Sequence, residues 1–207
     1  AILLMSDLHI DNPKCDRDLL KSHLDDAKAK DWPVLLLGDT FCAMQGVGDP
    51  RGSKSDVRPE HQTALYLDAV VNTTVAWLAP YAGNIALIGY GNHETSVLKR
   101  KETDLLARLA SGLQPHGFRG MLGRYAGFLE IVWKTGTYNR ARKVLYYDHG
   151  HGGGAKMSKG VLHFTQDRAI VPDADILAMG HTHDQMIVPL PVYRVSSRGT
   201  ISEETCW

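Results

Sequence analysis

Residues 34–39 read Val34-Leu35-Leu36-Leu37-Gly38-Asp39, an uninterrupted apolar run that ends in a glycine and an aspartate. A short continuous apolar run is typical of a strand that is buried on both faces of a sheet. Gly-Asp is ordinary turn chemistry when it is taken alone. The stretch therefore predicts a buried strand that places one carboxylate, Asp39, at its end.

The same kind of apolar run recurs before and after this stretch, at Ile2–Met5, Ile85–Ile88, Val144–Tyr147 and Ile176–Met179. Between the runs lie stretches with apolar residues at helical spacing, at Asp16–Lys30, Thr63–Leu78 and Ser96–Leu113. Alternating strands and helices predict an α/β sandwich. The stretch Thr63–Leu78 fits a core helix or a dimer face, and we expect the core helix.

Two further β regions are indicated. Phe128–Trp133 and Val144–Tyr147 flank a turn-rich segment and predict an antiparallel hairpin, and Met186–Val188 with Val192–Val195 predict a second β region. No repeat or linker divides the chain, so we expect one domain over residues 1–207. Residues 43–60 are rich in Gly, Pro, Ser and charge, and we expect them to form a long loop beside the substrate cleft.

The composition is that of a soluble globular protein, with 43% hydrophobic and 22% charged residues in 207. No apolar run approaches the about 18 to 20 residues that span a bilayer. We expect no signal peptide and no membrane contact. The cysteines are odd in number and lack metal-like spacing, which favours a reducing cytoplasm; they are Cys15, Cys42 and Cys206.

The net charge of zero hides an uneven distribution. Residues 95–145 hold 10 Lys and Arg against 3 Asp and Glu, whereas residues 1–94 hold 8 against 13. A basic segment can contact a polyanion such as nucleic acid, or it can be a solvated helix face followed by a basic hairpin. The sequence leaves both interpretations open.

Polar motifs follow the predicted strands. A carboxylate and an imidazole two residues apart lie on the same side of an extended chain, as do two imidazoles at that spacing. Each motif alone has an ordinary explanation, such as a surface loop, a core histidine or a helix cap. Together they indicate a metal site, and ligands without a thiolate suit Mn, Fe or catalytic Zn better than structural Zn. The motifs are Asp7-Leu8-His9, Gly38-Asp39, Gly91-Asn92-His93-Glu94, His149-Gly150-His151 and Gly180-His181-Thr182-His183.

This order of motifs resembles the calcineurin-like metallophosphoesterases, whose pattern is D-x-H, G-D, G-N-H-[DE], H and G-H-x-H. The resemblance covers residues 7–183. The compact size and the basic middle of the chain also resemble the compact phosphoesterases of bacteriophages and bacteria. The resemblance to the family implies an αββα sandwich of two mixed β-sheets flanked by helices, with two divalent metal ions, most simply Mn, at the strand ends; Fe and Zn also suit the ligands.

The resemblance also implies a role for each motif residue. Asp39 would bridge the two metals, and His93 would stand over the phosphate as the catalytic residue. The first metal would be held by Asp7, His9 and His183, and the second by Asn92, His149 and His181.

Two assignments stay open. His149 directly ends a predicted strand and is the expected ligand, although His151 lies two residues on and is the alternative, or a substrate contact. Glu94 either orients His93 or favours the start of a helix.

Two metals about 3.5 to 4 Å apart lower the pKa of a bridging water and leave a hydroxide that attacks phosphorus. We therefore expect a phosphodiesterase or phosphatase that acts on nucleic acid or nucleotides. Gly38-Asp39-Thr40-Phe41 resembles the corresponding motif of nucleases and phosphodiesterases. The Asp-Arg-Gly signature of the Ser/Thr protein phosphatases is absent here, which argues against that branch. The competing hypotheses are a non-catalytic scaffold that binds a protein partner, and a mononuclear zinc hydrolase.

Overall fold

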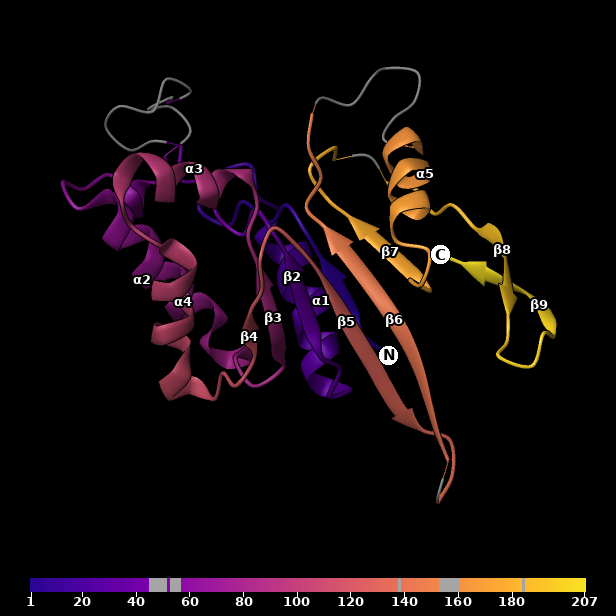
Figure 1. Cartoon of the computed structure of the whole chain (residues 1–207). Coiled ribbons are helices and arrows are strands. Elements are labelled where there is room, and N and C mark those ends of the chain that lie inside the picture. Colours follow the sequence, from indigo (N-terminus) through magenta and orange to yellow (C-terminus); the bar gives the residue numbers. More distant parts are fainter. Residues whose placement is uncertain (45–51, 53–56, 138, 153–160, 184) are drawn as a thin grey trace. The chain divides into compact units, whose positions relative to one another are not determined.

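The structure, a computed structural model, describes residues 1–44, 52, 57–137, 139–152, 161–183 and 185–207, without the side chains of residues 162 and 163. The chain forms two compact units, Ala1–Tyr125 and Ala126–Trp207 (Figure 1). Each unit has its own sheet, so the predicted α/β class is confirmed. That these units make one αββα domain stays a prediction, because two sheet-bearing units occur in one domain or in two.

The sheet of unit 1 has four parallel strands in the spatial order β1-β2-β3-β4. All four residues of β2 are buried, as predicted, whereas β1 at the sheet edge is only partly buried. The prediction of full burial is therefore wrong for β1, and it is also wrong for the strand Ile176–Met179, where only Leu177 is buried. The strands are β1 (Leu3–Met5), β2 (Val34–Leu37), β3 (Ile85–Gly89) and β4 (Met121–Leu122).

Four α-helices belong to this unit: α1 (Arg17–Ala29), α2 (Tyr66–Leu78), α3 (Asn92–Lys101) and α4 (Leu105–Leu113). The first two confirm the predicted helices, but the single helix predicted over Ser96–Leu113 is wrong. Glu102 takes a left-handed conformation (φ 52°) and ends α3. Asp104 then caps α4, because its carboxylate accepts hydrogen bonds from two backbone N–H groups of the first turn.

The described part of unit 1 also contains three short 3-10 helices, Pro59–His61, Ala79–Tyr81 and Gln114–His116. None of the helices that the structure describes is both long and apolar enough to cross a bilayer.

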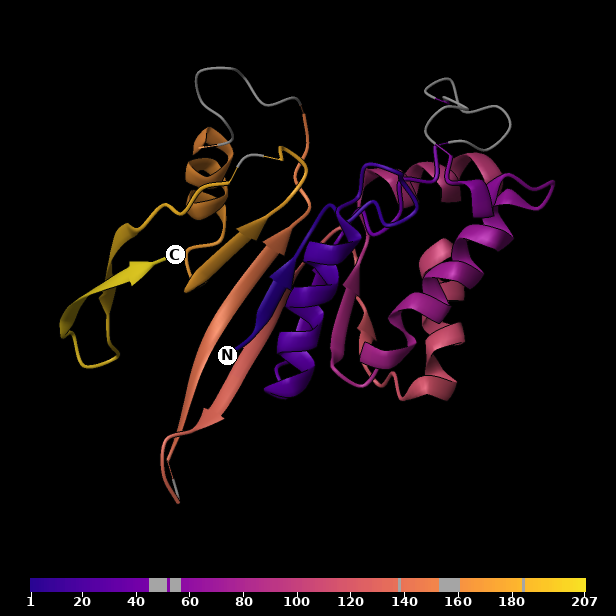
Figure 2. The same cartoon turned by 180° about the vertical axis from the view of Figure 1, so that it is seen from behind.

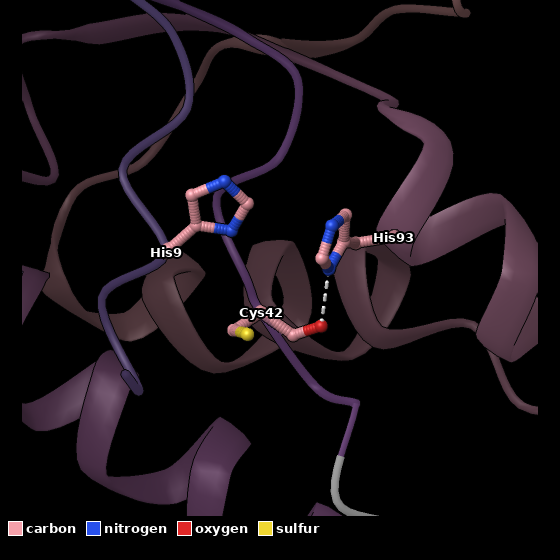
Figure 3. Close-up of side chains that lie close together, drawn as sticks. All are labelled: His9, Cys42 and His93. Carbon is pink, nitrogen blue, oxygen red and sulfur yellow. Dashed lines mark hydrogen bonds between the residues drawn. The ribbon is translucent and has the colours of Figure 1, made fainter. Parts of the chain in front are cut away.

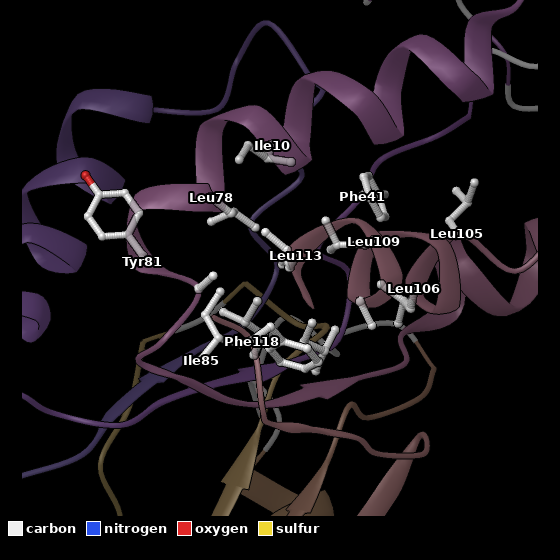
Figure 4. Close-up of a cluster of buried hydrophobic side chains, with 14 of the residues drawn as sticks. Ile10, Phe41, Leu78, Tyr81, Ile85, Leu105, Leu106, Leu109, Leu113 and Phe118 are labelled. Atoms are coloured by element: carbon white, nitrogen blue, oxygen red, sulfur yellow. The ribbon is translucent and has the colours of Figure 1, made fainter. Parts of the chain in front are cut away.

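One hydrophobic cluster joins α1, α2 and α4 to the parallel sheet of unit 1 (Figures 2 and 4). Two of its fully buried members, Ile10 and Phe41, lie outside the helices and strands, in the loops that follow β1 and β2. Burial of one such side chain stabilises the fold by about 1.5–3 kcal/mol. These two residues therefore anchor the loops that carry His9 and Asp39 in the core.

The sheet of unit 2 contains β5, β6 and β7, and the helix α5 precedes β7 in the chain. The strands β5 and β6 form the predicted antiparallel hairpin, and β6 pairs with β7 in parallel. Parallel neighbours need a crossover connection, in which α5 lies, although the sequence analysis did not predict this helix. The elements are β5 (Ala126–Lys134), β6 (Arg140–Asp148), α5 (Val161–Ile170) and β7 (Ile176–Met179).

A second hairpin, β8 (Leu190–Val195) and β9 (Ile201–Cys206), ends the chain (Figure 2). The predicted strand Val192–Val195 is confirmed, but the one at Met186–Val188 is wrong, because β8 pairs with β9 instead. Pro191 is tolerated because both strands of a two-stranded sheet are edges. A small cluster that includes Ala174, Leu177 and Cys206 packs this hairpin against α5 and the sheet of unit 2.

Asp175 connects three elements of unit 2. Its carboxylate accepts hydrogen bonds from Val144 N (2.7 Å), Lys143 Nζ (3.0 Å) and Arg194 Nη2 (3.2 Å). Burial raises the pKa of Asp175, but the Val144 N–H and the Lys143 ammonium outweigh it and hold the pKa below its ordinary 3.8. A carboxylate with a lowered pKa stabilises the fold at pH values above 3.8, and this contribution is lost as the pH falls through the folded-state value.

We therefore expect Asp175→Asn to lower the unfolding free energy of unit 2 by about 1–3 kcal/mol at neutral pH. The difference from the unmodified chain shrinks as the pH falls from 3.8 through the lower folded-state pKa, below which the carboxyl is protonated in both states. Amide hydrogen exchange of β6 and β7, measured across a urea series at several pH values, checks this. Asp173→Asn, at an exposed position nearby, is the matched control. A pH-independent loss would contradict the electrostatic explanation.

Candidate metal centre

The motif residues of unit 1 gather at one edge of its sheet. The strands β1, β2 and β3 are parallel neighbours, so their carboxyl ends lie at the same edge. Asp7, Asp39 and Asn92 follow these three strands. Beyond the strands, Asp7 N donates to Gly38 O (3.0 Å) and His9 N donates to Asp39 O (3.0 Å), which holds the first two loops together.

The backbone of the motif residues is unusual. Among the described residues, eight that are not glycine have a left-handed φ, and five of these eight are predicted metal ligands. Such a conformation costs a residue with a side chain about 1–3 kcal/mol and is concentrated at functional sites. The five are Asp7 (φ 55°), His9 (43°), Asp39 (48°), His181 (72°) and His183 (56°). The fold therefore tolerates strain at the positions where the motifs predict ligands.

Asp39 lies at the centre of the unit 1 residues and is buried. Its Oδ2 atom is 4.0 Å from His9 Nε2 and 3.7 Å from His93 Nε2. Its Oδ1 atom accepts a hydrogen bond from the backbone N of His93 (2.9 Å). One carboxylate with an imidazole on each side is a donor set that a divalent metal accepts.

The ring of His93 is fixed by the backbone. Its Nδ1 donates a hydrogen bond to the carbonyl oxygen of Cys42 (2.6 Å), as Figure 3 shows. With the proton held on Nδ1, the Nε2 of the neutral ring has a free lone pair on the side of Asp39. The ring of His9 packs against it, with centroids 4.7 Å apart.

Asp11 holds the Cys42 carbonyl in place, and the sequence analysis missed it. Its buried carboxylate accepts hydrogen bonds from the backbone N of Cys42 (2.5 Å) and of Ala43 (2.8 Å), and from the Tyr66 hydroxyl (3.4 Å). Asp11 therefore orients His93 through the Cys42 loop. Its signal in the sequence is its place two residues after His9, on the same side of an extended chain.

Glu94 joins two of the motifs. Its buried carboxylate accepts hydrogen bonds from Gly91 N (2.9 Å), Asp39 N (3.2 Å) and Phe41 N (2.8 Å). Burial, and then the nearby Asp39 charge, raise the pKa of Glu94 well above its ordinary range. Of the two roles left open for Glu94, these contacts support the helix start, since the bond to Gly91 N caps α3. They add another role, which is to join the Asp39 loop to α3.

Gly91 permits this close approach. A Cβ atom at this position would overlap the side chain and the backbone nitrogen of Asp39. We expect Gly91→Ala to force the two loops apart, to lower the unfolding free energy by about 1–3 kcal/mol and to weaken metal binding. Thermal unfolding and equilibrium dialysis with Mn²⁺ check both effects. Gly83→Ala is the matched control, because its Cβ would meet nothing within 4 Å; an equal effect of both variants would refute the packing argument.

Unit 2 gathers the histidine motifs in the same way. His149 follows β6 and His181 follows β7, and these strands are parallel neighbours. The two rings lie with their centroids 5.5 Å apart, and His149 is fully buried. His151 and His183 are exposed. The burial of His149 and its packing against His181 support it over His151 as the ligand of this motif.

The ring of His181 is held by the glycine-rich loop. Its Nε2 lies 2.7 Å from Gly152 O, and donation to this carbonyl makes Nδ1 the acceptor nitrogen of the neutral ring. Each unit thus gathers its own predicted ligands at one sheet edge, and the residues present suit divalent metals. That the two groups form a single centre stays a prediction.

Two further sequence predictions concern the 43–60 loop and the basic segment 95–145. Most of the 43–60 loop lies outside the described residues, so its place beside a cleft stays a prediction. Part of the basic segment is locally neutralised, because Arg108 pairs with Asp68 and Arg142 with Glu130. Those pairs favour a solvated surface for at least these two basic side chains.

Comparison with protein-family models, with curated proteins and with solved structures finds no match to this chain. The resemblance to calcineurin-like metallophosphoesterases therefore depends on the motifs alone, and the geometry of the two units is the independent observation beside it.

Proposed function

We propose that this chain is a metal-dependent phosphoester hydrolase with a dinuclear metal centre. The observation that carries the proposal is the left-handed backbone at Asp7, His9, Asp39, His181 and His183. Backbone strain concentrated at these few residues has a physical reason if their side chains must point at a common ligand. Asn92 and His149, which follow β3 and β6, complete the proposed ligand set.

In the proposed centre, Asp7, His9 and His183 would hold one metal, Asn92, His149 and His181 would hold the other, and Asp39 would be a ligand of both. When bound, two divalent ions, most simply Mn²⁺, activate water and neutralise charge on the phosphate. Fe and Zn suit the same donors.

The proposed work of His93 is to move a proton. Its Nδ1–H is held by the Cys42 carbonyl, so Nε2 is the atom that takes up the second proton of the imidazolium form and would donate it to the leaving oxygen. Glu94 and Asp11 are positioning residues, because Glu94 binds the backbone of the Asp39 loop and Asp11 binds that of the Cys42 loop. The protein thus places Nε2 before a substrate binds, which limits the reorganisation that the reaction needs.

The proposed substrates are phosphodiesters of nucleic acids or nucleotides. Support comes from the Gly38-Asp39-Thr40-Phe41 spelling and from the excess of basic residues in the segment 95–145, such as Lys99, Arg100 and Lys101 in the last turn of α3. We also propose a cytoplasmic location, because all three cysteines are free thiols, which is typical of a reducing compartment.

The proposal is tested with protein stripped of metal by a chelator and then supplied with Mn²⁺. We expect release of p-nitrophenol from bis-p-nitrophenyl phosphate, with two metal ions bound per chain. His116→Ala, in a 3-10 helix remote in sequence from every motif, is the control for handling. One metal ion per chain would indicate a mononuclear hydrolase instead.

A substrate panel with Mn²⁺ then separates the branches of the family. Single-stranded DNA, duplex DNA, cyclic nucleotides and a phosphoprotein are compared at equal concentration. A nuclease should bind DNA with an affinity that falls steeply as the salt concentration rises. Metal binding without hydrolysis of any member would favour the non-catalytic scaffold.

A further inference from the structure

A thiol lies among the imidazoles of unit 1, and the family pattern gives it no role. One ligand atom from each of His9, Cys42 and His93 lies within 4.8 Å of the other two. Figure 3 shows the side chains of His9 and His93 beside each other above Cys42, whose carbonyl oxygen faces the ring of His93. All three belong to unit 1, so the arrangement does not depend on the position of unit 2.

We propose that His9, Cys42 and His93 form a distinct binding site for one thiophilic divalent ion, with Zn²⁺ as the natural candidate. Two imidazoles and a thiolate are ligands that Zn²⁺ prefers, and a fourth position is left for water or for Asp39. Zinc bonds of about 2.0–2.1 Å to nitrogen and 2.3 Å to sulfur place ligand atoms roughly 3.3–3.7 Å apart in a tetrahedron. Ligand atoms already within 4.8 Å need only small movements to reach that spacing.

The surroundings of the three side chains suit metal binding. The bond from His93 Nδ1 to the Cys42 carbonyl is the kind of outer contact that orients a ligating histidine and leaves Nε2 to bind. Asn12 Nδ2 lies 3.4 Å from Cys42 Sγ and can donate to a thiolate there. As the metal binds, Cys42 Sγ forms the metal–sulfur bond and releases its proton to solvent.

Occupation of this site excludes the proposed catalytic arrangement. His9 is a ligand of the dinuclear centre and His93 is its proton donor, so a Zn²⁺ ion that takes both removes one ligand and the acid together. This regulatory consequence rests on the proposed function, whereas the binding site itself does not. Zinc is therefore expected to inhibit turnover supported by Mn²⁺ through Cys42.

Binding is tested on the metal-free full chain with Co²⁺, which reports its ligands by absorption. We expect a thiolate-to-cobalt charge-transfer band that Zn²⁺ abolishes by displacement. X-ray absorption of the Zn²⁺ form should show one sulfur neighbour at about 2.3 Å. Cys42→Ser should lose the band and more than about tenfold in Zn²⁺ affinity, because loss even of outer contacts costs that much. Cys15→Ser, a second free thiol in unit 1, should keep both.

A wild-type protein without the charge-transfer band, or a band that survives in Cys42→Ser, overturns the site. The absorption measurement on the unmodified protein decides the matter even if a variant fails to fold. For inhibition, each protein is compared with its own rate without Zn²⁺, and equal Zn²⁺ sensitivity of Cys42→Ser and Cys15→Ser overturns the regulatory role. Absence of any turnover with Mn²⁺, beside an intact cobalt spectrum, would refute the proposed function and leave the zinc site standing.

Discussion

Asp39→Asn is expected to abolish Mn²⁺-dependent hydrolysis and to reduce bound metal from two ions per chain to one or none. The carboxylate is buried and its Oδ2 lies 4.0 Å from Nε2 of His9, a proposed ligand of the first metal, and 3.7 Å from Nε2 of His93, the proposed proton donor. In the proposed centre this carboxylate would offer an oxygen to each metal. An amide retains the shape and the hydrogen bond from the His93 backbone but lacks the negative charge and the second oxygen ligand. Metal analysis after gel filtration, together with p-nitrophenol release, measures both effects.

The fold itself should survive Asp39→Asn. Asp39 raises the pKa of the buried Glu94, which means that the two groups destabilise each other when both are charged. Removal of one charge is therefore expected to leave the unfolding free energy of the metal-free protein unchanged or higher. Asp26→Asn, on the exposed side of α1, is the control and should leave metal content and rate as they are. Full activity in Asp39→Asn would contradict the proposed centre.

His93→Ala is expected to keep two metal ions per chain but to lower kcat by about 10²–10⁴, which is the usual contribution of a positioned proton donor. The side chain is 13% exposed and its Nε2 lies 3.7 Å from the carboxylate of Asp39, the proposed bridging ligand, so it can reach a substrate without being a ligand of the proposed centre. Steady-state rates and metal content on the same sample separate these effects.

A substrate with a good leaving group sharpens the His93 test. A p-nitrophenolate ion leaves without a proton, so the loss of rate in His93→Ala should be smaller for an aryl diester than for an alkyl diester or DNA. His23→Ala is the matched control, because His23 lies on the exposed surface of α1. Loss of metal equal to that in Asp39→Asn would show that His93 is a ligand instead of the proton donor.

Several strands were predictable because a short uninterrupted apolar run has a distinctive spelling, whereas the two-residue strand β4 has no such run. Val34–Leu37 and Ile176–Met179 are strands with the bounds that the apolar runs predicted. The break between α3 and α4 was not predicted, because Leu98, Leu105 and Leu109 keep a helical spacing across it. The break depends on Glu102, which adopts a left-handed conformation that its residue type disfavours.

The contacts of the candidate site were less predictable than its residues. The motifs indicated Asp39 and His93, but the roles of Asp11 and Cys42 depend on tertiary hydrogen bonds between loops distant in sequence. Left-handed φ values at aspartate and histidine also have no local signal, since the surrounding fold imposes them. The strand β9 escaped prediction because Ser202, Glu203 and Glu204 lack a continuous apolar pattern.

The fully buried positions of Ile10 and Phe41 have a consequence for evolution and for engineering. Both side chains belong to the same hydrophobic cluster as residues of α2 and α4. The distance between His9 and Asp39 therefore depends on how this cluster packs. A substitution that leaves a cavity at Leu109 should therefore first change the metal preference, at temperatures where the circular dichroism of the chain is still native. Substitutions in the hydrophobic core that leave the fold intact can in this way change the metal preference of the proposed centre, although every ligand stays the same.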